Sequence, residues 1–464
     1  MSLSDLTAGW KELSAALPGY LEAERYFKGT VDEVFTSPKI QALIASTGAR
    51  YRFNLIKTAV TVLASRIELL SVHAVDDEAA TELIRRVWTA NDWDIHFPDL
   101  VRRTMEFGDA YVMAWPSDLD DVGVDEDQAT AGVELTVHDP KHCRAIYDPE
   151  NERRMLFVIK RWHVPSPEGG RWRADLYFAD ALESWVSRDG QDPASPQSWL
   201  PFTDDLDTDE DGTAPNPFGE IPFWHYRTDL PYGVPEHFAG YGCQDALNKM
   251  LVTQLTTTDS HGWPQRYALT DKGAALDEAT DGPGWDDDST DDTPLGGGAE
   301  SALRTGPGTV MALNGMKAVG QFAAAEPRVF TDPATTYIRL MAQVTETPLH
   351  AFDPSGDAPS GESLKVAEAP LVKKTERREA MFRAPTVSMW RFVLRVLGVK
   401  PPALDVRWAA ARSATGKADW EAVTVQQAAG VPVDQTLIEA GYPAEQVADW
   451  AAARSAPTPP PQAA

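Results

Sequence analysis

The sequence has few groups that could cross-link it or anchor it in a membrane. It has only two cysteines among 464 residues, too few for the disulfide framework of a secreted protein, which favours a reducing compartment. The most apolar stretch, LIKTAVTVLASRIELL, is interrupted by Lys57, Arg66 and Glu68, so we expect no membrane span. The first residues lack a basic head and an apolar core, so we expect no signal peptide. These absences favour a soluble, cytosolic protein.

Motifs of catalysis and of nucleotide binding are missing too. The chain has no G-x-x-x-x-G-K-[ST] phosphate loop and no G-x-S-x-G elbow, and its nine histidines fit no hydrolase pattern. We therefore expect no catalytic residue, no cofactor and no enzyme activity.

Positive charge is scarce, because 42 Lys and Arg against 70 Asp and Glu give a net charge of −28. A surface this acidic repels nucleic acid instead of holding it. The stretch QTLIEAGYPAEQVADW resembles a helix-turn-helix, but its second helix carries Glu445 and Asp449 and no Lys or Arg. We expect no sequence-specific reading of DNA.

Two acidic clusters suggest cation sites that their context does not support. Residues 207–212 match the first half of a calcium loop, but Pro215 and Phe218 occupy its ninth and twelfth positions. Residues 286–292, DDDSTDD, have no fixed scaffold around them. We interpret the first cluster as a solvated linker and the second as a charged loop.

A third cluster combines two histidines with a cysteine. His138, Asp139, His142 and Cys143 lie on a strand, a turn and the next strand, so their side chains need not converge. No second Cys/His pair lies at zinc spacing. We expect no bound metal.

Hydrophobic periodicity predicts helices at both ends of the chain and strands between them. Residues 109–203 contain β-branched and aromatic segments separated by turn residues, which predicts an antiparallel sheet region. Later come a helix at 241–258, strands at 266–270 and 309–315, and a helix at 333–346. The other expected helices cover 4–28 with a break at Pro18, 50–70, 79–90, 96–107, 361–397 with interruptions at Pro370 and Pro385, and parts of 416–453.

This order predicts an α+β protein in which a small β unit is inserted between two helices. Residues 271–300 of the insertion are too polar and too rich in glycine to pack. A helix, an insertion and a second helix suggest a stalk that carries something at its tip. The Pro-rich C-terminal end is expected to be disordered.

A loop rich in Gly, Pro, Ser and Asp precedes a long basic helix. The loop, residues 350–361, leads into Gly-Glu-Ser where a phosphate site needs Gly-Lys-Ser/Thr. The helix could be amphipathic with a solvated face, stabilised by ion pairs such as Glu379–Arg383, or it could face a polyanion. Its basic residues include Lys365, Lys373, Lys374, Arg377 and Arg378.

Six segments follow one another in a specific order. They are RYFKG (25–29), FNLIKTAVTVLASRI (53–67), FGDAYVMAW (107–115), NPFGEIPFWHYRTD (216–229), SGESLKVAEAPLVKKTERREAMF (360–382) and AAGVPVDQTLIEAGYPAEQVADW (428–450). Together they resemble the portal proteins of tailed bacteriophages, in the group typical of siphophages that infect actinobacteria. Each segment is a weak signal alone, whereas the ordered set covers most of the chain.

The resemblance implies a portal-like subunit and a ring, typically of twelve copies, at one vertex of the capsid. DNA would be packaged and ejected through this ring. The implied parts are a helical and β wing at 1–232, a first stem helix at 233–262, a small β clip at 263–329, a second stem helix at 330–346, a tunnel loop at 347–361, and a long helix and crown at 362–464.

The resemblance also implies partners and a location. The partners would be the terminase large subunit, a head–tail adaptor, the major capsid or scaffold protein, and double-stranded DNA that passes without being read. The protein would be assembled in the host cytoplasm and reside in the virion, with no membrane. The basic helix would face a neighbouring subunit or DNA. The residues facing the channel would be Asp353, Pro354, Gly356, Asp357, Pro359, Ser360 and Gly361.

Two other functions stay open on the sequence. An acidic metal-dependent phosphodiesterase would use the aspartate clusters, but it would need them on ordered strands. An adaptor or scaffold protein of the same particle would usually be much shorter.

Overall fold

The computed structural model describes most of the chain. The chain divides into two compact units. Of the described residues, the larger unit contains those within 3–30, 53–246 and 337–451, and the smaller contains those within 247–336. No helix among the described residues is long and apolar enough to cross a membrane. The described residues are 3–30, 53–116, 132–165, 170–188, 196–203, 211–261, 266–270, 316–321, 328–352, 361–411, 418–439, 447, 450 and 451.

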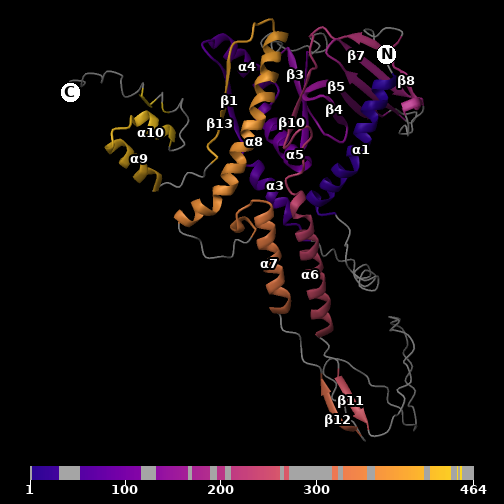
Figure 1. Cartoon of the computed structure of the whole chain (residues 1–464), viewed down its shortest axis with the longest axis vertical. Coiled ribbons are helices and arrows are strands. Elements are labelled where there is room, and N and C mark those ends of the chain that lie inside the picture. The colour runs from indigo at the N-terminus through magenta and orange to yellow at the C-terminus, as the bar shows by residue number, and fades with distance from the viewer. Residues whose placement is uncertain are drawn as a thin grey trace, which may run out of the picture. The chain divides into compact units, whose positions relative to one another are not determined.

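Helices of the larger unit enclose two small antiparallel sheets. Strand β2 lies between β10 and β3, and β1 pairs with β13. Helix α8 runs beside β10, β13 and α4 (Figure 1), and Trp390, Phe392 and Val393 place it in the main core. The bounds are α3 Ile56–Ala64, α4 Glu78–Ala90, α5 Trp93–Phe107, α8 Gly361–Val396, β1 Leu69–Ala74, β2 Asp109–Pro116, β3 Val133–His138, β10 Phe223–Arg227 and β13 Leu404–Trp408.

A larger antiparallel sheet forms the rest of this unit. Its strand order is β4-β5-β6-β7-β8, with β9 paired to β7. Helix α1 buries Leu6 and Leu13 against it, and a Cβ on Gly9 would lie 3.1 Å from Phe157, so the helix approaches the sheet closely. The bounds are α1 Leu3–Lys28, β4 Cys143–Asp148, β5 Asn151–Val164, β6 Arg171–Tyr177, β7 Ala181–Ser187, β8 Trp199–Pro201 and β9 Thr213–Pro215.

The smaller unit confirms that a β hairpin separates two helices. Strand β11 (Arg266–Thr270) pairs with β12 (Met316–Gln321), between α6 (Tyr241–His261) and α7 (Arg328–Val344). The strand expected at 309–315 lies outside the described residues, and β12 follows that stretch directly. The α+β class is therefore confirmed, as is the antiparallel sheet region, which divides into two sheets.

Three expected helix interruptions were wrong. Helix α1 continues through Pro18, and α8 is one helix of 36 residues through Pro370 and Pro385. A proline inside a helix frees the carbonyl four residues earlier. Before Pro370 this is the carbonyl of Val366, whose side chain is 72% exposed, so water can satisfy it.

The helix expected at 50–70 was also too long. Among the described residues of this stretch, 53–70, only Ile56–Ala64 is α-helical, and Leu69–Ala74 is strand β1, whose residue Leu69 pairs with Trp408. The partner strand is more than three hundred residues away in sequence, so local periodicity gave no sign of it. The C-terminal helices, α9 (Ala418–Ala428) and α10 (Val433–Glu439), lie inside the predicted region.

Candidate functional site: the signature segments and the basic helix

Asp109, from the segment FGDAYVMAW, is fully buried at the start of β2. Its carboxylate accepts hydrogen bonds from the Tyr20 hydroxyl at 2.6 Å and the Gly233 N–H at 2.7 Å. His225 Nε2 lies 2.8 Å away, and Arg144 lies 3.5 Å away. Burial alone would raise the pKa of Asp109, but the interaction with His225 and the hydrogen bonds from Tyr20 and Gly233 hold it below its ordinary value. One carboxylate thereby ties α1, β4, β10 and the turn after β10 to β2.

His225 completes this network as a neutral side chain. Burial lowers its pKa, so Nε2–H donates to Asp109 while Nδ1 accepts from the Tyr147 hydroxyl at 2.7 Å. The side chains of Asp109 and His225 both lack access to solvent. The arrangement therefore joins elements of the fold and has no open face for a substrate.

Gly108, in the same segment, is where two backbones cross. It ends α5 with a φ of +85°, a left-handed conformation that favours glycine. A Cβ on Gly233 would lie 1.9 Å from the Gly108 carbonyl oxygen. Neither position has space for a methyl group.

The segments RYFKG and FNLIKTAVTVLASRI meet at the start of α3. Asn54 donates from Nδ2 to the Phe27 carbonyl at 2.8 Å and accepts from the Lys57 N–H at 3.4 Å. A Cβ on Gly29 would lie 3.0 Å from the same amide. The asparagine thus joins the end of α1 to the start of α3.

The first turns of α6 are held against this junction. Gln244 Oε1 accepts from the N–H groups of Leu55 and Ile56 at 3.0 and 3.1 Å. The ring of Tyr26 stacks on that of Tyr241 at 3.6 Å. The Gln244 carbonyl satisfies donors at the start of α3, which a helix leaves unpaired.

Asn216, from the segment NPFGEIPFWHYRTD, organises the turn before β10. Its Nδ2 donates to the carbonyls of Phe178 and Glu220 at 2.8 and 2.9 Å, and its Oδ1 accepts from the Phe218 N–H at 3.1 Å. The asparagine therefore shapes backbone and leaves no free group for a ligand.

Two of the five predicted basic residues of α8 bind a carboxylate of their own chain. Lys374 Nζ lies 2.8 Å from Glu236, and Arg378 Nε lies 2.5 Å from it. Lys374 also donates to the Thr345 carbonyl and Arg378 to the Thr228 carbonyl. The Glu236 side chain is 4% exposed, so this is a buried ion-pair cluster that clamps α8 to the turn after β10 and to the end of α7.

The other three, Lys365, Lys373 and Arg377, are exposed. The ion pair expected between Glu379 and Arg383 is not formed. Arg383 instead lies 3.3 Å from Asp405, and Oε1 of Glu379 is buried without a hydrogen-bond partner among the described residues. Burial and the nearby Glu376 raise the pKa of Glu379 to about 7.

The predicted channel residues cannot be placed. Residues 353–360, which include Asp353, Pro354, Gly356, Asp357, Pro359 and Ser360, lie outside the described residues, and Gly361 is the first residue of α8. Residues 207–210 and 286–292 of the two acidic clusters also lie outside them.

His138, Asp139 and Cys143 of the third cluster have separate surroundings. His138 is partly buried beside Phe223, and loss of solvation lowers its pKa to about 3. Asp139 lies within 4 Å of Arg103 and Lys141, and Cys143 is fully buried. Among the described residues, no group of three or more His, Cys, Asp and Glu could hold a metal ion.

Comparisons with known proteins give a consistent family. The family model for phage portal proteins of the SPP1 Gp6-like type matches residues 10–454. The portal protein of Mycobacterium phage L5 is 24% identical over 454 residues, which cover 92% of this chain and 82% of the relative. The portal protein of Mycobacterium phage D29 is 23% identical over 438 residues, which cover 91% and 81%.

Solved structures show weaker similarity. A chain from the virion of a native gene transfer agent particle is 13% identical with a TM-score of 0.41, covering 92% of this chain and 99% of the other. A chain from the neck of an empty gene transfer agent particle is also 13% identical, with a TM-score of 0.45 and coverages of 88% and 95%. Scores of this size do not establish a shared fold.

Proposed function

Because this chain belongs to the phage portal proteins of the SPP1 Gp6-like family, we propose that it forms a twelve-membered ring through which double-stranded DNA enters and leaves the capsid. Membership makes it a structural protein of the virion and not an enzyme. Portal proteins form ring oligomers. The number twelve and the passage of DNA through this ring belong to the proposal.

The observation that carries the proposal is the match over residues 10–454. The contacts that residues of the signature segments make within their own chain support it. Asp109, Asn54 and Asn216 each bind groups of their own chain. Such residues build a fixed subunit framework. A metal-dependent phosphodiesterase would need several carboxylates converging on ordered elements, and among the described residues no such group of three is placed to hold a metal.

We assign the parts of the chain accordingly. The wing is 1–232, the stem helices are 233–262 and 330–346, the clip is 263–329, and the long helix and crown are 362–464. The position of the β11–β12 hairpin between α6 and α7 supports this assignment. The clip would meet the terminase large subunit during packaging and the head–tail adaptor afterwards, and the wing would meet the capsid or scaffold protein.

Imaging of the purified protein tests the ring. Negative-stain electron microscopy should show closed rings with a central hole, and mass photometry should give a single species near twelve subunit masses. A monomer or an open filament at all concentrations would overturn the proposal.

The tunnel loop, 347–361, is proposed to touch DNA weakly. Duplex DNA carries one phosphate charge per ~1.7 Å of axis, so cationic walls would hold it by counterion release. Asp353 and Asp357 would prevent such capture. Asp353→Lys combined with Asp357→Lys should leave rings intact and slow DNA packaging in a terminase-driven assay, whereas the same pair changed to Asn, the matched control, should have a smaller effect. Normal packaging by the lysine variant would contradict this role.

A further inference from the structure

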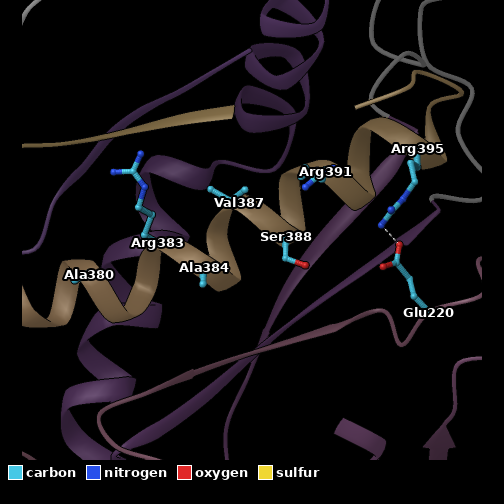
Figure 2. Close-up of a pocket in the computed structure, with 8 residues that line it drawn as sticks. All are labelled: Glu220, Ala380, Arg383, Ala384, Val387, Ser388, Arg391 and Arg395. Carbon is cyan, nitrogen blue, oxygen red and sulfur yellow. Dashed lines mark hydrogen bonds and ion pairs between the residues drawn. The ribbon is translucent and has the colours of Figure 1, made fainter. Parts of the chain in front are cut away.

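The C-terminal half of α8 carries a groove of about 600 Å³ that none of the roles above uses. Its lining forms two adjacent rows at four-residue spacing. One row is small, with Ala380, Ala384 and Ser388, and the other is mainly basic, with Arg383, Val387, Arg391 and Arg395. Figure 2 shows Arg383 and Val387 on one side of the helix and Ala384 and Ser388 on the other.

The groove has more positive charge than the described residues around it neutralise. Arg395 pairs with Glu220, and Arg383 pairs with Asp405 through side chains that are 54% and 44% exposed. In the described part of the chain, no carboxylate lies within ion-pair distance of Arg391, which is exposed. A surface-exposed guanidinium beside a row of small residues suits a partner that brings carboxylates on a closely packed helix.

The same chain has a C-terminal segment of the opposite charge, which contains helices α9 and α10. Residues 418–451 contain six acidic residues and no Lys or Arg. Helices α9 and α10 in this segment pack on each other, with Thr436 and Leu437 buried. Val425 is 68% exposed and Val433 is 38% exposed, so the pair presents apolar side chains, and the sequence of the segment is acidic.

We propose that the groove on α8 binds the acidic α9–α10 segment of a neighbouring copy of this chain. The arginine row would receive the carboxylates, and the small row would let the partner helix approach closely. Each copy carries both surfaces, and two different surfaces are what a closed head-to-tail ring requires. The proposal rests on the ring proposed above and names one of its contacts.

Charge reversal at Arg391 tests the groove without disturbing the core, because its side chain is exposed. In the full chain, Arg391→Glu should reduce the fraction of protein in rings at least tenfold near the midpoint of assembly, measured by mass photometry. Arg153→Glu, at an exposed arginine on β5, makes the same charge change outside the groove and should assemble normally. Circular dichroism should be unchanged for both. If Arg391→Glu assembles like the wild type, this inference fails while the ring stands.

Photo-crosslinking identifies what occupies the groove. A photoreactive amino acid replacing Ser388 is placed in isotopically heavy subunits, which are mixed with light ones and allowed to assemble. A heavy–light crosslink to residues 418–451 supports the proposal. A crosslink within one copy, or to any other segment, overturns it. Absence of rings in the wild-type protein would instead overturn the proposed function, and this contact with it.

Discussion

The N-terminal half of α8 carries five Lys and Arg and the C-terminal half carries three, and the ion pairs of the two halves have very different surroundings. In the N-terminal half, Lys374 and Arg378 are each 12% exposed and share the buried carboxylate of Glu236. In the C-terminal half, Arg383 and Arg395 are 54% and 48% exposed, and their ion pairs lie at the surface. The first set holds the subunit together, whereas the second set is available to another molecule.

The comparison shows that the basic residues of a single helix can have different functions. Breaking a buried ion pair leaves an uncompensated charge in a poorly solvated place. Breaking an exposed one leaves a charge that water and salt screen. Burial, which the sequence does not display directly, decides whether a cation serves folding or association.

The largest difference in stability is expected between variants of two arginines that are adjacent in sequence. Arg378→Glu should destabilise the subunit by at least about 3–5 kcal/mol, because it places a second carboxylate beside Glu236. Arg377→Glu, at an exposed position, should change stability by less than about 0.5 kcal/mol. Urea denaturation of both variants gives the comparison. Equal stabilities would show that the buried cluster is not a clamp.

Removing the carboxylate of Glu236, which Lys374 and Arg378 share, should destabilise the subunit somewhat less. Glu236→Gln keeps the shape and one acceptor but leaves Lys374 and Arg378 without a counter-charge, at a cost of about 2–3 kcal/mol. The same assay in 1 M salt should recover little of the loss, because buried pairs are weakly screened. Full recovery in salt would mean that the cluster is open to solvent.

Glu379, between the two halves, predicts a pH dependence. Its pKa in the folded protein is about 7, above the ordinary value near 4.3. The raised pKa means that the folded protein binds this proton more tightly than the unfolded chain does. The resulting stability is fully present below the pKa of the unfolded chain and is lost as the pH rises through about 7. Glu379→Gln should therefore be more stable than the wild type at pH 8 by about 1 kcal/mol, after allowance for solvent screening. The two proteins should converge near pH 4.5. A constant difference across this range would exclude titration of Glu379 as the cause.

The smallest effect is expected at the surface pair. Glu220→Gln removes the partner of Arg395 and should cost no more than about 1 kcal/mol, with the loss disappearing at high salt. Calorimetry at two salt concentrations measures it. A loss comparable to that of Glu236→Gln would make the two halves of α8 alike.

The sequence predicted what depends on local pattern. The α+β class, the strands from Asp109 onward and the helices on both sides of the β11–β12 hairpin follow from periodicity. Pairing between β1 and β13 could not be predicted, because its partners are distant in sequence. The prolines of α8 were misread, because tertiary packing of residues such as Trp390 and Phe392 outweighs a lost hydrogen bond.

For the site, the signature segments contain Asp109, Asn54 and Asn216, whose contacts the sequence could not show, and the role of the channel residues stays a prediction. Glu236 was missed altogether, since one glutamate in a short connection resembles a solvated residue. Its only signal is its position after Pro235, between β10 and α6, where a turn must be anchored. The groove was also missed, because its two rows become visible only once α8 is known to be one uninterrupted helix.

The crossing of backbones at Gly108 and Gly233 restricts how this protein can evolve. Substituting either glycine adds a methyl group where a Cβ on Gly233 would sit 1.9 Å from the other backbone, so change at one position cannot be rescued by change at its neighbour. A saturation library of the chain should therefore tolerate almost no substitution at either position. We therefore expect both glycines to be kept, or both to be lost together with the turn that contacts Asp109.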